Sequence, residues 1–499
     1  MIRGFHRIIF MTFAGISLLA ACGGANIDPN CLLPRDVNEI IALQGGSAGD
    51  TGEPGDVRVY VDGSGSMAGF ARAGQPGNTP FQAVIDSLVQ LTASGRGNPR
   101  MRFFRLSGDH VPELSGERAQ IQEAIRSPDF YLCRGPAVGE RCSFQHSRTT
   151  LVFDQVARAP QNSLSIFLSD LWFSDDQITS QPSVALRESL ARILQTRDIA
   201  IYGVRAPYAG TLADLPSGDR SVRPPALAFY LVVAGPSARI REFHQNMERP
   251  GSRWIRDNLG GQRLPFSIFS TSAVASGGPG DNRFQLPADT PNPGVRADPN
   301  IWRAQQARIP DQFLINTDRV NETSRGPVWQ WPTNLPAGLV WTGEFEPVVE
   351  ARRIENRDSC SILTTEQQDA LRIERIAAPA RAAPAGPAGA AVRPAPPGPM
   401  FRLVLDPSIF LNRLRRGEWL IVGKLRRTSI QTDNPATQWL RDWSFDGTIQ
   451  SENAARLRQD FFPTLNVAEF ARLMEYAVDD AARRSERPVA GFVTVVKVD

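Results

Sequence analysis

The alternation of apolar runs with amphipathic segments between Asp56 and Met247 is the feature that most constrains the fold. The runs 57–61 (VRVYV), 164–168 (LSIFL) and 226–233 (ALAFYLVV) are almost continuously apolar, which is typical of strands buried on both faces. Between these runs, apolar residues recur at helical spacing. The alternation therefore predicts an α/β fold with a doubly wound, mostly parallel sheet and helices on both faces.

The length of the chain predicts more than one domain, because 499 residues are too many for one ordinary core. We expect the α/β domain to cover residues 54–248. Beyond it, helical periodicity fades and proline, glycine and tryptophan become frequent. We therefore expect one β-rich domain that is formed by residues 249–377 and 400–499. The intervening residues 378–399 are rich in Ala, Pro and Gly, which is typical of a linker or a solvated loop.

The N-terminal residues 1–21 are expected to be a signal peptide. Two arginines precede the apolar run 8–21, which is too short to span a membrane as a helix. The run ends in Leu-Ala-Ala before Cys22, which resembles a bacterial lipobox and implies a lipid on that cysteine, followed by a tether over 22–53. Because Gly23 rather than Asp follows, we expect a cell-envelope lipoprotein at the outer membrane, facing the periplasm. The alternative is an ordinary cleavage site with an incidental cysteine.

The remaining cysteines are even in number, which in an oxidising compartment favours disulfides. They are Cys31, Cys133, Cys142 and Cys360. Three pairings are formally open. A local Cys133–Cys142 bridge is favoured because these two are nine residues apart in the sequence, and Cys31 would then pair with Cys360. The alternative is four unpaired thiols.

A short polar motif follows the first expected strand. Asp62, Ser64 and Ser66 stand at alternate positions of the segment DGSGSM, and the glycines between them allow a tight loop. Carboxylate and hydroxyl oxygens suit Mg²⁺, which prefers oxygen ligands. Thr149 precedes a later helix and Asp170 follows the strand 164–168, so both are expected to add oxygens at the same edge of the sheet.

These residues resemble the metal-ion-dependent adhesion site of von Willebrand factor type A (vWA) domains. The family pattern is Asp-x-Ser-x-Ser after the first strand, a threonine in a later loop and an aspartate after the fourth strand. The matching residues are Asp62, Ser64, Ser66, Thr149 (with Thr150 as the alternative) and Asp170. The resemblance implies a vWA-like or Rossmann-like domain that holds Mg²⁺, or Mn²⁺ or Ca²⁺, and binds a protein partner presenting an acidic residue. Arg148, beside the threonine, would be placed to contact that carboxylate.

The other function classes are weighed against this one. A net charge of +3 indicates no nucleic-acid partner, and the widely spaced histidines disfavour a zinc hydrolase. The loop of Asp62 and Ser64 does not have the Gly-x-Ser-x-Gly pattern that a serine hydrolase needs. Phosphoryl transfer on Asp62 would need a lysine nearby, and the sequence has no lysine before Lys424. We therefore expect a binding protein and not an enzyme. The alternatives left open are a metal-free structural envelope lipoprotein and, behind it, a hydrolase built on that loop.

Overall fold

The structure, a computed structural model, places most of the α/β part and shorter segments of the rest. It describes residues 55–73, 79–93, 99–134, 142–144, 147–174, 177–178, 181–212, 223–248, 264–271, 284–285, 294–298, 301, 312–316, 328–330, 345–356, 361–365, 371–376, 400–405, 416–427, 434–445, 461–484 and 490–499. The expected signal peptide, the tether with Cys22 and Cys31, the linker 378–399 and Cys360 lie outside the described residues.

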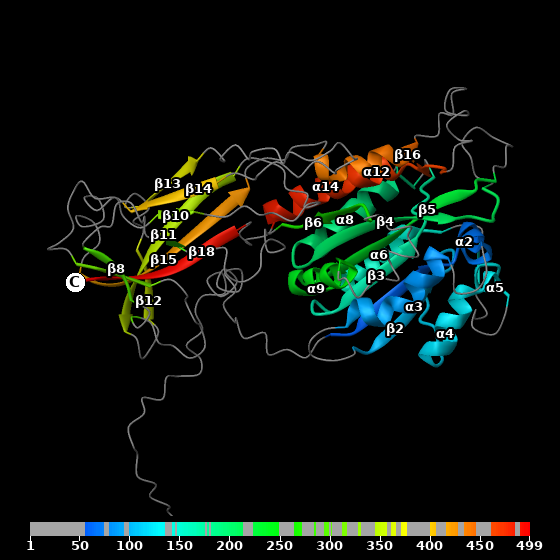
Figure 1. The fold of residues 1–499 in the computed structure, drawn as a ribbon, viewed down its shortest axis with the longest axis horizontal. Helices are drawn as coiled ribbons and strands as arrows, with labels where there is room; N and C mark the ends of the chain where they lie inside the picture. Colours follow the sequence, from blue (N-terminus) through cyan, green and yellow to red (C-terminus); the bar gives the residue numbers. More distant parts are fainter. Residues whose placement is uncertain are drawn as a thin grey trace, which may run out of the picture.

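The first part of the chain forms a six-stranded sheet in the order β2-β1-β3-β5-β4-β6 (Figure 1). Its strands are β1 (Val57–Asp62), β2 (Met101–Leu106), β3 (Leu164–Ser169), β4 (Asp198–Pro207), β5 (Ala226–Gly235) and β6 (Phe266–Phe269). The central strands β1, β3 and β5 are buried almost throughout, as their apolar runs predict. The prediction of an α/β fold is confirmed.

The strand directions make this sheet mixed. β1 pairs in parallel with β2 and β3, whereas β5 is antiparallel to both β3 and β4, and β6 is antiparallel to β4. The apolar run of β5 predicts its burial but not its direction. A parallel return needs a long crossover, usually a helix, and the described residues between β4 and β5 (208–212 and 223–225) contain no helix, in keeping with the antiparallel pairing.

Helices cover both faces of the sheet and enclose one apolar core on each side. One face carries α2 (Ala68–Arg72), α3 (Pro80–Thr92), α4 (Arg118–Arg126), α5 (Pro128–Tyr131) and α9 (Ser237–Glu248). The other carries α6 (Thr149–Arg158), α8 (Gln181–Leu194) and α14 (Val467–Arg484). Helix α3 begins as its sequence predicts: Thr79 Oγ1 accepts a hydrogen bond from the Gln82 N–H, and Pro80 follows directly.

Helix α14 comes from near the end of the chain, within the segment 400–499 expected to belong to the β-rich domain. It nevertheless packs on the first sheet, where Phe470 lies against Phe153 of α6 with 5.8 Å between the ring centroids. Arg187 of α8 donates two hydrogen bonds to Asp480 of α14, at 2.6 and 2.8 Å. The core of the α/β part is therefore completed by residues that begin about 200 positions after the last strand of its sheet.

Gly203 of β4 lies where α12 (Gln438–Asp442) approaches the sheet. A Cβ atom at Gly203 would lie 2.4 Å from Cζ3 of Trp439 and 2.6 Å from Cζ3 of Trp443. Gly203→Ala is expected to lower the free energy of unfolding by about 1–3 kcal/mol, because backbone or indole rings must shift. Urea denaturation measures this, with Gly65→Ala as the control, since its nearest neighbour would be 3.5 Å away. Equal losses in the two variants would contradict this packing.

Two further sheets lie to one side of the α/β part (Figure 1). Their orders are β13-β14-β10-β7 and β12-β11-β15-β18-β9-β8. The strands are β7 (Phe284–Gln285), β8 (Val295–Ala297), β9 (Gln312–Ile315), β10 (Val328–Gln330), β11 (Phe345–Asn356), β12 (Ser361–Thr365), β13 (Leu371–Ile376), β14 (Met400–Leu405), β15 (Gly417–Arg427) and β18 (Ala490–Val498). Strand β18 follows α14 in the chain, so the chain leaves the α/β part again to end inside the larger of these sheets.

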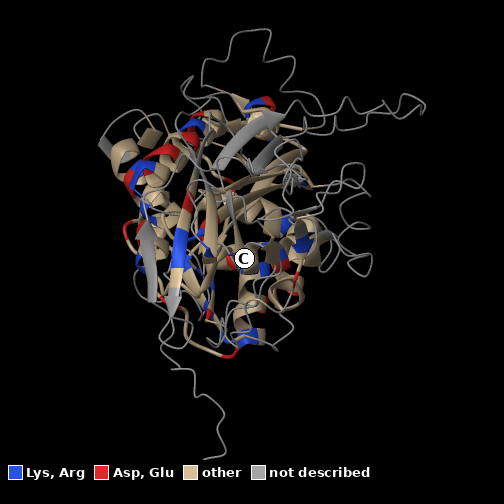
Figure 2. Ribbon diagram, turned by 90° about the vertical axis from the view of Figure 1, so that its left-hand side faces the viewer, with Lys and Arg blue, Asp and Glu red and all other residues tan. Residues whose placement is uncertain are grey.

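Charged residues are spread through the described fold. Figure 2 shows basic and acidic residues interspersed along helices and strands, and in that view the described basic residues do not gather into one block. The sequence as a whole has 55 basic and 52 acidic residues, in keeping with this mixture. Within the described segments, no helix is long and apolar enough to cross a bilayer.

Candidate functional site

The candidate site lies at the edge of the sheet where β1 and β3 end. These two strands are parallel neighbours, with Val61 paired to Leu168, so that the residues after them emerge side by side. Asp62 is the last residue of β1, and Asp170 directly follows β3. The carboxyl ends of parallel strands are where α/β proteins bind ligands.

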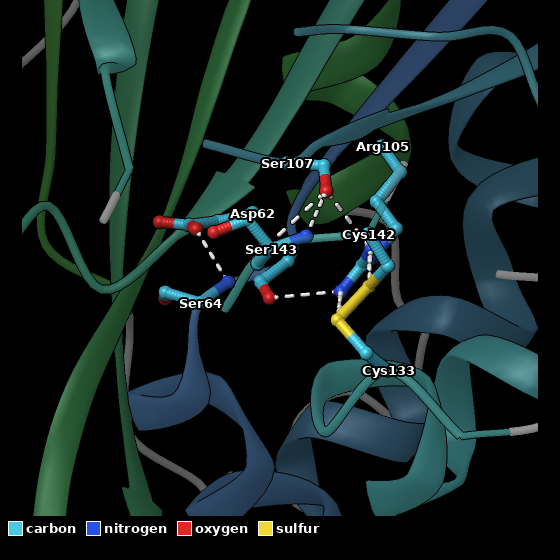
Figure 3. The surroundings of a disulfide bond; sticks show 8 residues. Asp62, Ser64, Arg105, Ser107, Cys133, Cys142 and Ser143 are labelled. Atoms are coloured by element: carbon cyan, nitrogen blue, oxygen red, sulfur yellow. Dashed lines mark hydrogen bonds between the residues drawn. A yellow bond between two sulfur atoms is a disulfide. The ribbon is translucent and has the colours of Figure 1, made fainter. Parts of the chain in front are cut away.

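The Asp62 carboxylate is buried and held by three neutral donors. Its Oδ1 accepts hydrogen bonds from the Ser64 N–H at 3.0 Å and from the Ser147 hydroxyl at 2.8 Å. Its Oδ2 accepts one from the Ser169 hydroxyl at 2.7 Å. Figure 3 shows the Ser64 contact. These bonds fix the direction of the carboxylate but do not neutralise its charge.

The two serine hydroxyls of the loop lie next to each other. Ser64 Oγ and Ser66 Oγ are 2.9 Å apart, and both residues are half-buried. The loop is tied to the segment after the disulfide, because the Gly65 N–H donates to the Phe144 carbonyl at 3.0 Å. Gly63 has no room for a side chain, since a Cβ there would lie 2.5 Å from the Leu106 carbonyl. The backbone thus turns tightly and presents both hydroxyls beside Asp62.

Asp170 is buried with one carboxylate oxygen left without a hydrogen bond. Its Oδ1 accepts from the Trp172 N–H at 3.2 Å, but Oδ2 has no partner. Burial raises the pKa of Asp170 to about 7, and the nearby charge of Asp62 acts in the same direction, while the Ser66 hydroxyl partly opposes both. The site therefore holds two carboxylates close together, and one of them is poorly satisfied.

This donor set suits a hard cation. The two carboxylates and the two adjacent hydroxyls offer the oxygen ligands that such an ion prefers. A divalent ion would offset the mutual repulsion of the carboxylates and would give the unpartnered Oδ2 of Asp170 a partner. Among the described residues, no group of three or more His, Cys, Asp or Glu side chains is placed to hold a metal ion. The fit thus depends on hydroxyl ligands to complete the set.

Thr149 and Arg148 lie at the start of α6. Thr149 is buried as the first residue of that helix, but no hydrogen bond joins its side chain to Asp62 among the described residues; Ser147, two positions earlier, makes that contact. Arg148 is exposed and forms an ion pair with Asp109 at 3.0 Å. The structure therefore brings together four of the five expected ligands (Asp62, Ser64, Ser66 and Asp170). Thr149 is connected to them only indirectly, because it lies two residues after Ser147, which contacts Asp62.

Arg105 joins the disulfide to the loop. Cys133 and Cys142 form a disulfide bond, with their Cα atoms 5.6 Å apart (Figure 3). The Arg105 guanidinium is fully buried and donates to the Gly63 carbonyl at 3.1 Å, to Ser107 Oγ at 3.2 Å and to both sulfur atoms. Burial lowers the pKa of Arg105 to about 10, so it remains a cation at neutral pH. A buried positive charge therefore lies directly behind the Asp62 loop.

Sequence reasoning missed Ser147, Ser169 and Arg105. Ser147 stands two positions before Thr149 and Ser169 one position before Asp170. Their closeness to the expected ligands was the sequence feature that could have indicated their contacts with Asp62. Nothing in the sequence pointed to Arg105, because only the pairing of β1 with β2 brings it beside Gly63.

Comparisons with protein-family models, with curated proteins and with solved structures each returned no match to this chain.

Proposed function

We propose that this chain is a cell-envelope lipoprotein that binds a protein partner through a divalent cation. In this proposal the α/β part is a doubly wound, vWA-like domain, and a lipid on Cys22 anchors the chain at the outer membrane, facing the periplasm. Helices on both faces of the sheet and acidic residues at its carboxyl edge support the domain assignment. The antiparallel strands β5 and β6 differ from the mostly parallel sheet that the assignment implies.

The ion would be Mg²⁺, or Mn²⁺ or Ca²⁺. Asp62 and Asp170 would hold it together with the hydroxyls of Ser64, Ser66 and Thr149. Because hydroxyls are neutral, the charge of the ion would be incompletely compensated, which favours an acidic ligand. When bound, the ion supplies a coordination position for a carboxylate of the partner. The observation that carries the proposal is the buried, unpartnered Oδ2 of Asp170 beside the charge of Asp62.

The proposal is one of binding and not of catalysis. Two alternatives make different predictions: a metal-free structural lipoprotein would ignore divalent ions, and a hydrolase would act through Ser64. No specific contact favours either, since Ser64 Oγ is bonded to another hydroxyl and not to a histidine.

Metal binding is tested by thermal unfolding of the full-length chain in detergent. Replacing chelator by millimolar Mg²⁺ or Mn²⁺ is expected to raise the melting temperature, because an ion that binds only the folded state stabilises it, by about 2.7 kcal/mol at one hundred times the Kd. Asp62→Ala is expected to abolish the rise, since it removes the best-held carboxylate of the site. Asp56→Ala, which removes a partly exposed carboxylate next to the opposite end of β1, should keep it.

Two measurements separate the alternatives: thermal unfolding with divalent ions, and an assay of ester hydrolysis. The absence of a shift with Mg²⁺, Mn²⁺ and Ca²⁺ would favour the metal-free structural lipoprotein. Hydrolysis of a generic ester that is lost in Ser64→Ala would favour the hydrolase.

A further inference from the structure

A pocket of about 470 Å³ lies at the same edge of the sheet as the candidate metal site. Its walls are Arg72 at the end of α2 and residues 208–211 and 223–225 of the β4–β5 connection. β3 and β4 are both antiparallel to β5, so they run in the same direction, and β4 ends at the edge where Asp170 follows β3. The pocket is therefore built from loops that neighbour the candidate site.

Tyr208 forms a wall shared by the pocket and the candidate site. Its hydroxyl donates to the Ser66 carbonyl at 3.0 Å, and the next residue, Ala209, donates its N–H to the Gly69 carbonyl at 3.0 Å. The fit is tight, since a Cβ at Gly69 would lie 2.2 Å from the Tyr208 ring. Burial and the nearby charge of Asp170 raise the pKa of Tyr208. A ligand in the pocket would thus lie next to one bound at Ser66 and Asp170.

Two arginines give the pocket its charge. Arg72 and Arg223 are both exposed, and no ion pair joins either to a carboxylate among the residues that the structure describes. Arg223 is oriented, because its Nε donates to Thr211 Oγ1 at 3.3 Å. Its outer nitrogens make no hydrogen bond to the residues that the structure describes. Among the described residues that line the pocket, none is acidic. A guanidinium with free outer N–H groups recognises a carboxylate through paired hydrogen bonds.

We propose that this pocket, with Arg72 and Arg223 as its cations, binds a second carboxylate of the acidic partner, while the first is held at the candidate metal site. The proposal rests on the proposed function for the first carboxylate only. The ligand is accordingly a protein segment with at least two acidic side chains, and the pocket contributes affinity that requires no metal ion.

The probe is fluorescently labelled poly-L-glutamate, which presents carboxylates at every spacing, bound to the full-length chain in detergent. Binding is measured by anisotropy at about 0.15 M salt, which screens long-range attraction, with Mg²⁺ or with chelator. The double variant Arg72→Gln/Arg223→Gln is expected to lose about tenfold or more in affinity in both conditions, since charge-assisted hydrogen bonds are lost. The matched control is Arg118→Gln/Arg158→Gln, which removes two exposed arginines outside the pocket and should bind as the wild type does.

The outcomes distinguish the two proposals. If the pocket variant binds like the matched control with Mg²⁺ and with chelator, the pocket proposal is overturned, whatever the metal does. If Mg²⁺ and Asp62→Ala change nothing but the pocket variant still weakens binding, the metal proposal fails and the pocket stands. The arginine variants are exposed-site changes, whereas Asp62→Ala is a change at a buried residue, so the melting temperature of each variant in chelator checks that it folds.

Discussion

Asp170→Asn is expected to stabilise the metal-free chain at pH 8 by on the order of 2–4 kcal/mol. Burial and the charge of Asp62 raise the pKa of Asp170 from 3.8 to about 7, so ionising this carboxyl costs free energy in the folded state. Asparagine keeps the shape and the acceptor for the Trp172 N–H, but it carries no charge. Urea denaturation in chelator measures the difference in the free energy of unfolding.

The sign of the pH dependence follows from the raised pKa. Between pH 4 and pH 7 the folded chain holds a proton on Asp170 that the unfolded chain has released, so the stability due to this group is complete below about pH 4 and is lost as the pH rises through about 7. In chelator, the wild type should therefore become less stable over this window, and Asp170→Asn should not. A divalent ion at the site would favour the ionised form, so Mg²⁺ is expected to flatten the wild-type profile.

The control for this prediction is Asp86→Asn, which removes a partly exposed carboxylate paired with Arg126. It should leave the pH profile of the wild type in place. A metal-free Asp170→Asn chain that is no more stable than the wild type at pH 8 would contradict the assigned cost of ionising Asp170.

Arg105→Met is expected to lower the free energy of unfolding by roughly 3–5 kcal/mol. Methionine preserves apolar contact with Phe130, whose ring centroid is 5.0 Å from the guanidinium carbon, but it removes the guanidinium donor of the buried Gly63 carbonyl. Ser107 Oγ loses one hydrogen bond and keeps the one from the Ser143 N–H. The charge behind Asp62 is also removed. Urea denaturation measures the loss, and the melting-temperature rise with Mg²⁺ is expected to shrink as the loop loses its support.

Arg105→Lys separates charge from geometry. Lysine keeps the positive charge, but a single ammonium cannot reproduce the fixed fork that bridges the loop, Ser107 and the disulfide, so an intermediate loss is expected. Arg118→Met, at an exposed position, is the matched control and should cost little. If Arg105→Lys and Arg105→Met lose the same amount, the network and not the charge accounts for the effect; if neither loses more than Arg118→Met, Arg105 does not support the loop.

The strands and helices of the first part could be predicted because each signal is local. The apolar run 226–233 identifies β5, and Thr79 with Pro80 marks the start of α3. Strand direction and sheet order depend instead on how distant segments pair, and so the antiparallel β5 was not predictable from its own residues. The same holds for α14, whose amphipathic pattern indicates a helix but not the sheet that it covers.

Only part of the candidate site could likewise be predicted from the sequence. Asp62, Ser64 and Ser66 share one loop, so their proximity could be predicted from spacing, and Asp170 follows from the parallel pairing of neighbouring strands. The neutral donors Ser147 and Ser169 flank the expected ligands, but which hydroxyl points toward Asp62 depends on loop geometry that spacing does not determine.

The late position of α14 in the chain has a consequence for biosynthesis. One side of the first sheet is covered only by α6 and α8 until residues 467–484 have left the ribosome, because Phe470 and its neighbours complete that core. Translation of almost the entire polypeptide must therefore precede maturation of the part that carries Asp62 and Asp170. A truncated product lacking its last 40 residues would therefore expose to proteases the apolar surface of the first sheet's helices that α14 covers.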